Sequence, residues 1–139
     1  MRKIFIDTNV LIDLILEREG YVAAAKVLAL TKKPGFILIV SVLTMANIAY
    51  ILRKTLRGER LYAELSKISS LLCVESLTKE VFERAVSLKA KDFEDSLQYC
   101  CAKSVQCEVI VTRNKKDFLF EDIQVLTPDE FNTIQELRG

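Results

Sequence analysis

The sequence contains no histidine. Neither a Ser-His-Asp nor a Cys-His catalytic arrangement can therefore be built, and a histidine general base is excluded. The four cysteines include no Cys-x-x-Cys pair, so a zinc site of the usual spacing is not expected either. We expect reduced and mostly buried thiols. If the protein is an enzyme, carboxylates and a metal ion must carry its chemistry.

The sequence also has few glycines, no long apolar run and almost no net charge. With only four glycines, the chain has neither a phosphate-binding loop nor a Gly-x-Gly-x-x-Gly pattern, which disfavours a nucleotide cofactor. No apolar segment reaches the roughly 18–20 residues that a membrane span needs, and the N-terminus lacks the layout of a signal peptide. The net charge of +1 gives no general attraction to nucleic acid. We expect a soluble, cytoplasmic protein that does not contact membranes.

The apolar residues that are present predict an α/β fold. A chain of 139 residues, half of them hydrophobic, suits one domain spanning residues 1–139. Five short and mostly continuous apolar runs predict strands covered on both faces, at residues 3–6, 36–40, 72–74, 109–111 and 124–126. Helical patterns lie between them at residues 10–16, 21–30, 41–57, 59–69, 78–90 and 92–105, and a capping box begins a last helix that runs to about residue 137. This alternation predicts a mostly parallel sheet with right-handed crossovers.

In an open parallel sheet, ligands bind beyond the carboxyl ends of the strands. The polar residues that follow the apolar runs, at positions 7–9, 41, 75–76 and 112–114, are therefore expected along one edge. Asp7 directly follows the run Ile-Phe-Ile, where a carboxylate is costly to desolvate unless it is paired, hydrogen-bonded or bound to a metal. The alternative is that Asp7 caps a helix that begins near Val10, for which Asn9 is the better candidate.

Two further acidic groups follow later strands. Asp92 and Asp95 are three residues apart and share one helical face, from which Glu94 points away. The alternative is structural, with Asp92 as the N-cap and Asp95 in the first turn. In the stretch TRNKKDF, Asn114 can cap a short turn that contains Asp117. A functional interpretation is favoured because all these acids are expected at the same edge of the sheet. Converging carboxylates form an oxygen-ligand site suited to Mg²⁺ or Mn²⁺. Such a site can activate water for attack on a phosphodiester.

Basic residues near this edge are candidates for binding RNA. The helix predicted for residues 41–57 has a basic end with Tyr50 nearby, which suits a phosphate backbone and a stacked base. The alternative is a solvated helix end that matches the helix dipole, and the lysines that follow Asn114 can equally be solvated. The RNA-binding candidates are Arg53, Lys54, Arg57, Arg113 and Lys115.

In their order and spacing, several short stretches resemble the PIN-domain family of metal-dependent nucleases, which includes toxins of bacterial toxin–antitoxin pairs. They are IFIDTNVLIDLI, ILIVSVLTMANIAYILRK, DFEDSLQYCCA, VIVTRNKKDF and VLTPDEF, and together they span essentially the whole chain. The resemblance implies a three-layer α/β/α sandwich with a mostly parallel sheet of about five strands. It also implies an acidic pocket that holds Mg²⁺ or Mn²⁺ and cleaves RNA, and an antitoxin protein as partner. Similar proteins often form homodimers.

Two of the family's four acidic positions hold asparagine here. The first acid falls on Asp7 and the third on Asp95, whereas the second and fourth positions hold Asn47 and Asn114. Asp117 is the nearest carboxylate that can compensate. The predicted metal ligands are therefore Asp7, Asp92, Asp95 and Asp117, and the predicted catalytic residues are Asp7, Asn47, Asp95, Thr112, Asn114 and Asp117.

The asparagines leave more than one function open. Asparagine keeps an oxygen ligand but loses the negative charge, which weakens the binding of a hard divalent ion. The leading hypothesis is a metal-dependent ribonuclease toxin, in which Asn47 and Asn114 orient ligands or water and Thr112 supports the pocket by hydrogen bonding. The alternatives are a catalytically impaired PIN-like module that binds RNA or a protein, and a protein whose main role is antitoxin binding with residual toxicity.

Overall fold

The computed structural model describes residues 1–118 and 120–138. Its centre is a five-stranded sheet in which all neighbouring strands run parallel, in the order β3-β2-β1-β4-β5. The strands are β1 (Arg2–Ile6), β2 (Phe36–Ser41), β3 (Cys73–Glu75), β4 (Val109–Val111) and β5 (Gln124–Leu126). The last two match the predicted runs at both ends, the first two each extend one residue beyond theirs at one end, and β3 is shifted by one residue at both ends.

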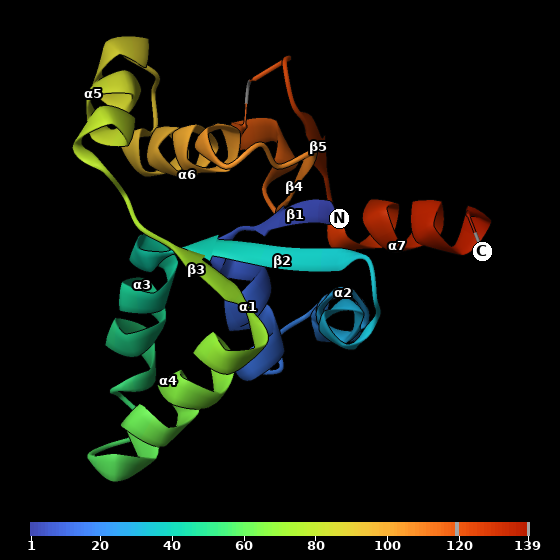
Figure 1. The fold of residues 1–139 in the computed structure, drawn as a ribbon. Coiled ribbons are helices and arrows are strands. Elements are labelled where there is room, and N and C mark those ends of the chain that lie inside the picture. Colours follow the sequence, from blue (N-terminus) through green and yellow to red (C-terminus); the bar gives the residue numbers. More distant parts are fainter. Residues whose placement is uncertain (119, 139) are drawn as a thin grey trace.

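Helices cover both faces of this sheet (Figure 1). One face carries α1 (Thr8–Ile15), α2 (Tyr21–Leu28), α3 (Val42–Leu52) and α4 (Glu59–Leu71), with α7 (Pro128–Leu137) packed beside α2. The other face carries α5 (Lys79–Leu88) and α6 (Phe93–Ser104). The predicted three-layer α/β/α sandwich is therefore confirmed.

The central strand β1 contributes to two separate cores, because successive side chains of a strand point to opposite faces of the sheet. Ile4 and Ile6 belong to the core beneath α1–α4, whereas Phe5 belongs to the core beneath α5 and α6. All three side chains are fully buried. Coverage on both faces explains why this run is continuously apolar rather than alternating.

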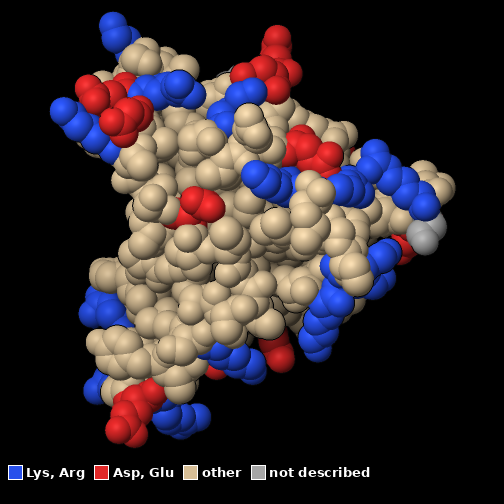
Figure 2. All heavy atoms as spheres, viewed as in Figure 1, with Lys and Arg blue, Asp and Glu red and all other residues tan. Residues whose placement is uncertain are grey.

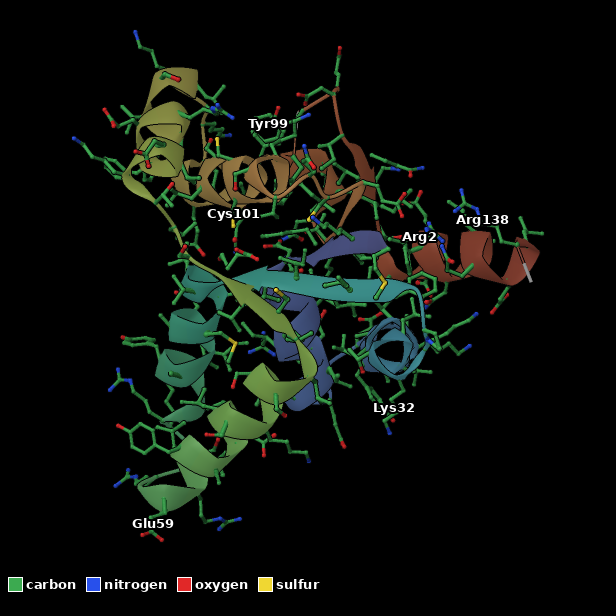
Figure 3. All side chains as sticks on the ribbon, viewed as in Figure 1. Arg2, Lys32, Glu59, Tyr99, Cys101 and Arg138 are labelled. Atoms are coloured by element: carbon green, nitrogen blue, oxygen red, sulfur yellow. The ribbon has the colours of Figure 1, made fainter. Side chains whose placement is uncertain are left out.

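Several helices end earlier than their sequence pattern predicts, among them α3 and α2. The helix predicted for residues 41–57 ends at Leu52, whose carbonyl accepts hydrogen bonds from the N–H and the hydroxyl of Thr55. Gly58, with a φ of 57°, then leads into α4 in a conformation that favours glycine. The helix predicted for residues 21–30 ends at Leu28 and continues as the short 3₁₀ turn Ala29–Lys32. The α3–α4 pair projects from the sheet as an arm with Glu59 at its tip (Figure 3).

The cysteines are free thiols, as predicted, and three of the four are buried. Burial raises the pKa of Cys101 to about 11 and that of Cys107 to about 12, so both remain protonated at neutral pH. Within residues 1–118 and 120–138, no helix is both long and apolar enough to cross a lipid bilayer.

The strand order places a topological switch point between β1 and β4. From β1 the chain moves to β2 and β3 on one side, and only later to β4 and β5 on the other. The residues that follow these two strands are neighbours, because the N–H of Asp7 donates to the carbonyl of Val111 at 3.0 Å. An open parallel sheet offers its ligand crevice at such a point. The fold therefore brings the predicted polar junctions to one edge.

Candidate active site

Asp7 is the first residue after β1 and the N-cap of α1. Its carboxylate accepts hydrogen bonds from the Thr8 N–H at 2.9 Å, the Asn9 side-chain amide at 3.1 Å and the Thr112 hydroxyl at 2.8 Å. Burial raises the pKa of Asp7, and the hydrogen bonds from Thr112 and Thr8 oppose that shift. Because a carboxylate has about four lone-pair sites, three donors leave one for a further ligand.

Asn9 has a role that local capping preference does not reveal. The helix begins at Thr8 rather than near Val10, and its cap is Asp7, so the prediction of Asn9 as the cap is wrong. Asn9 instead bridges two walls of the site: its amide donates to Asp7, and its carbonyl oxygen accepts from the Arg113 N–H at 3.1 Å. Its partner lies 104 residues along the chain, which is why sequence reasoning missed it.

Asp95 lies in the first turn of α6, three residues after the residue that caps this helix. Asp92 caps this helix as predicted, by accepting a hydrogen bond from the Asp95 N–H at 3.1 Å. Burial, together with the carboxylates of Asp92, Asp7, Asp117 and Glu94, raises the pKa of Asp95 to about 7. Asp95 is therefore partly protonated at neutral pH, and a nearby cation would favour its charged form.

The acids border two adjoining hollows. Asp7, Asp92, Glu94 and Asp95 line a pocket of about 240 Å³, here called the acidic pocket. Asp92 and Asp95 also line a neighbouring hollow of about 560 Å³ together with Asp117, here called the lateral cleft. Each of the four predicted metal ligands thus borders at least one of these two hollows at the carboxyl edge of the sheet, and Asp92 and Asp95 border both. In Figure 2, acidic atoms are exposed on the flank between the α5–α6 layer and the α3–α4 arm.

Glu94 belongs to this site, contrary to the prediction that it points away from Asp95. Its carboxylate accepts a hydrogen bond from the Asn47 side-chain amide at 2.7 Å. It lines the acidic pocket, and its charge contributes to the raised pKa values of both Asp95 and Asp7. Successive helical residues point about 100° apart, which gives no sign of this placement, and the partner on α3 is 47 residues away. The chain thus has a carboxylate beside Asn47 that sequence reasoning did not find.

A buried hydrogen-bond network beneath the pocket joins the elements that carry these residues. The Gln98 side-chain amide donates to the hydroxyls of Thr44 at 2.8 Å and Thr8 at 3.2 Å, and its carbonyl oxygen accepts from the Ser41 hydroxyl at 2.6 Å. All four side chains are buried. Three of them lie within one helical turn of a site residue: Thr8 beside Asp7, Thr44 before Asn47 and Gln98 after Asp95.

Two predicted site residues follow β4: Thr112 supports the acidic pocket, whereas Asn114 does not border it. Thr112 has the predicted supporting contact, because its buried hydroxyl donates to Asp7. Asn114 is exposed, and in the described residues its side chain makes no capping bond to the 3₁₀ turn Lys115–Asp117 and lines neither hollow. The turn is closed by the backbone, from the Asp117 N–H to the Asn114 carbonyl at 3.0 Å. A catalytic role for Asn114 stays a prediction.

Two of the predicted RNA-binding residues are held in ion pairs. The Arg113 guanidinium lies 2.6 Å from a carboxylate oxygen of Asp13, and the Lys115 ammonium lies 3.0 Å from a carboxylate oxygen of Glu130. The first pair connects the loop after β4 to α1, and the second connects the 3₁₀ turn to α7. Both residues therefore have structural contacts that compete with binding phosphate.

The other three predicted RNA-binding residues lie beyond the end of α3. The Arg53 guanidinium lies 4.1 Å from the centre of the Tyr50 ring and donates to the Tyr50 carbonyl. Lys54 and Arg57 are exposed. Arg53 is six residues beyond Asn47, about 9 Å farther along the helix axis. These residues can contact RNA only at a distance from the acids.

The donor set of the site suits a hard divalent cation. All charged groups that line the acidic pocket are carboxylates, and oxygen ligands are those that Mg²⁺ and Mn²⁺ prefer. Among the described residues, however, no three Asp, Glu, His or Cys side chains lie close enough to hold one ion. Mg²⁺ commonly uses one or two carboxylates and completes its coordination with water and phosphate. Asp7 and Asp95 fit that arrangement, whereas a closed cage of four carboxylates is not formed.

Comparison with known proteins identifies the family. A family model described as the PIN domain matches residues 3–116 of the chain. The chain belongs to the PIN-domain family. The resemblance predicted from five short stretches is thereby confirmed. The match ends one residue before Asp117, so the structure rather than the family model places this acid beside Asp95.

Relatives and solved structures agree with the PIN-domain assignment. Ribonuclease VapC1 of Aquifex aeolicus (strain VF5) is 33% identical over 138 residues, which cover 93% of this chain and 92% of that protein. A toxin–antitoxin complex from Klebsiella pneumoniae contains a similar chain, with a TM-score of 0.68, 25% identity and coverage of 89% and 96% of the two chains. VapBC-1 from nontypeable Haemophilus influenzae shares the fold, with a TM-score of 0.72, 19% identity and coverage of 91% and 98%.

Proposed function

We propose that this protein is a metal-dependent ribonuclease that hydrolyses RNA phosphodiesters as the toxin of a toxin–antitoxin pair. The observation that carries the proposal is the acidic pocket at the switch point, where Asp7 and Asp95 border a common space and Asp95 has a pKa raised to about 7. The identity to an Aquifex aeolicus ribonuclease supports the chemistry. The likeness to a Klebsiella pneumoniae toxin–antitoxin complex supports an antitoxin protein as partner.

In this proposal Asp7 and Asp95 hold Mg²⁺ or Mn²⁺, with Asp92 and Asp117 beside them. The ion would supply positive charge that lowers the pKa of a water molecule and stabilises the charge that develops on the phosphate. Thr112 keeps the Asp7 carboxylate in place through its hydrogen bond. Glu94 supplies the negative charge that Asn47 lacks at the family's second acidic position.

The test is RNA cleavage in the presence of Mg²⁺ or Mn²⁺ by the wild type and the Asp7→Asn variant. Asparagine has nearly the same shape as aspartate but lacks its charge, so we expect a rate lower by about 100-fold or more. Asp129→Asn, an exposed residue of α7, is the matched control and should cleave like the wild type. Equal rates for Asp7→Asn and the wild type would remove Asp7 from the mechanism.

A second candidate function is a PIN-like module that binds RNA or a protein without cleaving RNA. The asparagines at positions 47 and 114 favour it, as does the lack of three converging carboxylates among the described residues. Calorimetric titration with Mn²⁺ separates the two functions. Micromolar binding that is lost in Asp95→Ala would count against the inactive module, and no binding to the wild type would favour it.

A further inference from the structure

The lateral cleft has a composition that metal binding alone does not explain. Beside the three site acids it is lined by two lysines, Lys91 and Lys116, and by an apolar wall that includes Phe120 and Leu88. Its volume is about 560 Å³. Ammonium groups next to an aromatic surface match the two parts of a nucleotide, a phosphate and a flat base.

The two lysines reach the cleft from different elements. Lys91 directly precedes the cap of α6, and Lys116 lies in the 3₁₀ turn after β4. Both are exposed, and within the described part of the chain neither forms an ion pair. Their neighbours Arg113 and Lys115 are paired with acids, as described above. Lys91 and Lys116 therefore differ from these two neighbours in having no carboxylate partner among the described residues, which leaves their ammonium groups open to a ligand in the cleft.

Phe120 lines one side of the cleft and packs against a second aromatic ring. Its ring stacks on that of Tyr99, with 3.7 Å between centroids and 5° between planes. The Tyr99 hydroxyl donates to both carboxylate oxygens of Asp122, at 2.6 and 2.7 Å, and these contacts hold the Tyr99 ring in place. Phe120 itself remains partly exposed and lines the cleft. Because the Phe120 ring is already packed against Tyr99, a base that stacks on it would restrict few further side-chain conformations.

We propose that the lateral cleft binds one unpaired nucleotide of single-stranded RNA, with its phosphate on Lys91 and Lys116 and its base on Phe120. The inference rests on the proposed ribonuclease function and adds a substrate subsite beside the acids. Because the cleft shares Asp92 and Asp95 with the acidic pocket, this nucleotide adjoins the phosphodiester that is cleaved. A base inside a duplex is covered by its neighbours, so stacking on Phe120 selects single-stranded segments.

The lysine contacts are tested by the binding of a short fluorescent single-stranded RNA in EDTA, where a metal-dependent nuclease does not cleave it. Lys91→Gln and Lys116→Gln are each expected to weaken binding about fivefold and to flatten the slope of log affinity against log salt by about 0.7. Lys32→Gln is the matched control and should bind like the wild type. Lys32 is exposed and precedes β2, at the opposite edge of the sheet (Figure 3).

The base contact is tested by comparing intact RNA with an abasic RNA of the same length. Wild-type protein should bind the intact strand about tenfold more tightly, because each base stacked on an aromatic ring adds to the affinity. Phe120→Leu should bind both strands equally, and Phe120→Tyr should keep the preference. The comparison of the two RNAs on the wild type needs no substitution, so it holds even where Phe120→Leu loosens the packing against Tyr99.

Equal binding by the wild type and the Lys91→Gln, Lys116→Gln double variant would overturn the phosphate assignment. Equal binding of intact and abasic RNA, or duplex RNA bound as tightly as a single strand, would overturn the base assignment. Binding is measured apart from cleavage, so the two proposals fail separately. A protein that binds RNA in this way without cleaving it would contradict only the nuclease function, and one that cleaves RNA without these contacts would contradict only the cleft.

Discussion

At the scale of single residues, the two central carboxylates have different surroundings. Asp7 is 6% exposed and accepts three hydrogen bonds from neighbouring groups. Asp95 is half-buried and has four other acids near it, which together with burial raise its pKa to about 7. Asp95 is therefore a group whose charge changes near neutral pH.

Substitution of Asp95 by asparagine is expected to stabilise the protein at high pH in the absence of divalent ions. Asp95 titrates near 3.8 in the unfolded chain and near 7 in the fold. Between these values the folded state binds more protons, so the free energy of unfolding falls as pH rises. At pH 8 the midpoint of thermal unfolding should be about 2–4 °C higher in Asp95→Asn than in the wild type, and the difference should shrink at pH 5. An equal difference at both pH values would assign the effect to another cause.

Glu94 allows a charge-relocation experiment with Asn47. Glu94→Gln should weaken Mn²⁺ binding about tenfold, because it removes a carboxylate from the acidic pocket. Adding Asn47→Asp to that variant should restore most of the affinity, since the new charge lies where Asn47 now contacts Glu94. Calorimetric titration measures both effects, with Glu136→Gln on α7 as the control. An Asn47→Asp substitution that restores nothing would contradict the pairing of these two positions.

Sequence reasoning found the site residues that follow a local signal and missed the roles of those that are positioned by distant partners. Asp7 and Asp95 were predictable because each follows a recognisable local signal, a buried run or a capping pattern. Glu94 and Asn9 were misassigned because their positions depend on Asn47 and on the backbone of Arg113. Those contacts join residues far apart in the sequence, and local helix geometry contains no information about them.

At the scale of secondary-structure elements, the site depends on how the starts of α1, α3 and α6 are held together. Gln98 on α6 contacts Thr8 on α1, Thr44 on α3 and Ser41 at the end of β2. Buried polar groups need partners, and loss of Gln98 would remove one hydrogen bond from each of three buried hydroxyl groups. The network therefore fixes the spacing of the acids above it.

Replacement of Gln98 by methionine should lower the free energy of unfolding by about 1–3 kcal/mol. Methionine has a similar volume but cannot replace the hydrogen bonds to the three hydroxyl groups. The exposed Gln124 provides the control, because Gln124→Met should stay within about 0.5 kcal/mol of the wild type. Denaturant unfolding monitored by circular dichroism measures both. A Gln98→Met variant as stable as the wild type would mean that the network contributes no net stability.

The elements were largely predictable because most of them end at strong local signals. The strand β4 is a short apolar run between the polar residues Glu108 and Thr112, and β5 is followed directly by the capping box that begins at Thr127; the predicted ends of both strands are correct. The helix α3 was predicted too long because residues 53–57 are mostly good helix formers, Thr55 excepted, and contain no glycine or proline before Gly58. The helix α3 ends at Leu52, whose carbonyl accepts hydrogen bonds from Thr55 and whose side chain is buried in the core.

At the scale of the whole molecule, the site combines residues that follow the first strand with residues from the α3 helix, the start of α6 and the turn after β4. A ligand held by such distant segments stabilises the entire fold by mass action. Mn²⁺ at about 100 times its dissociation constant should raise the free energy of unfolding by about 2.7 kcal/mol. Chelation with EDTA should reverse the gain, and Asp7→Asn should show little of it. The same gain in Asp7→Asn would place the ion elsewhere.

The strand order has a consequence for the making of the protein. Asp7 emerges early in synthesis, yet the hydroxyl that holds its carboxylate belongs to Thr112, 105 residues later. β4 must also pair with β1 before the two walls of the pocket meet. A growing chain therefore has no complete pocket until residues beyond β4 have left the ribosome. Assembly of the site is delayed until the sheet has received strands from both sides of its first strand.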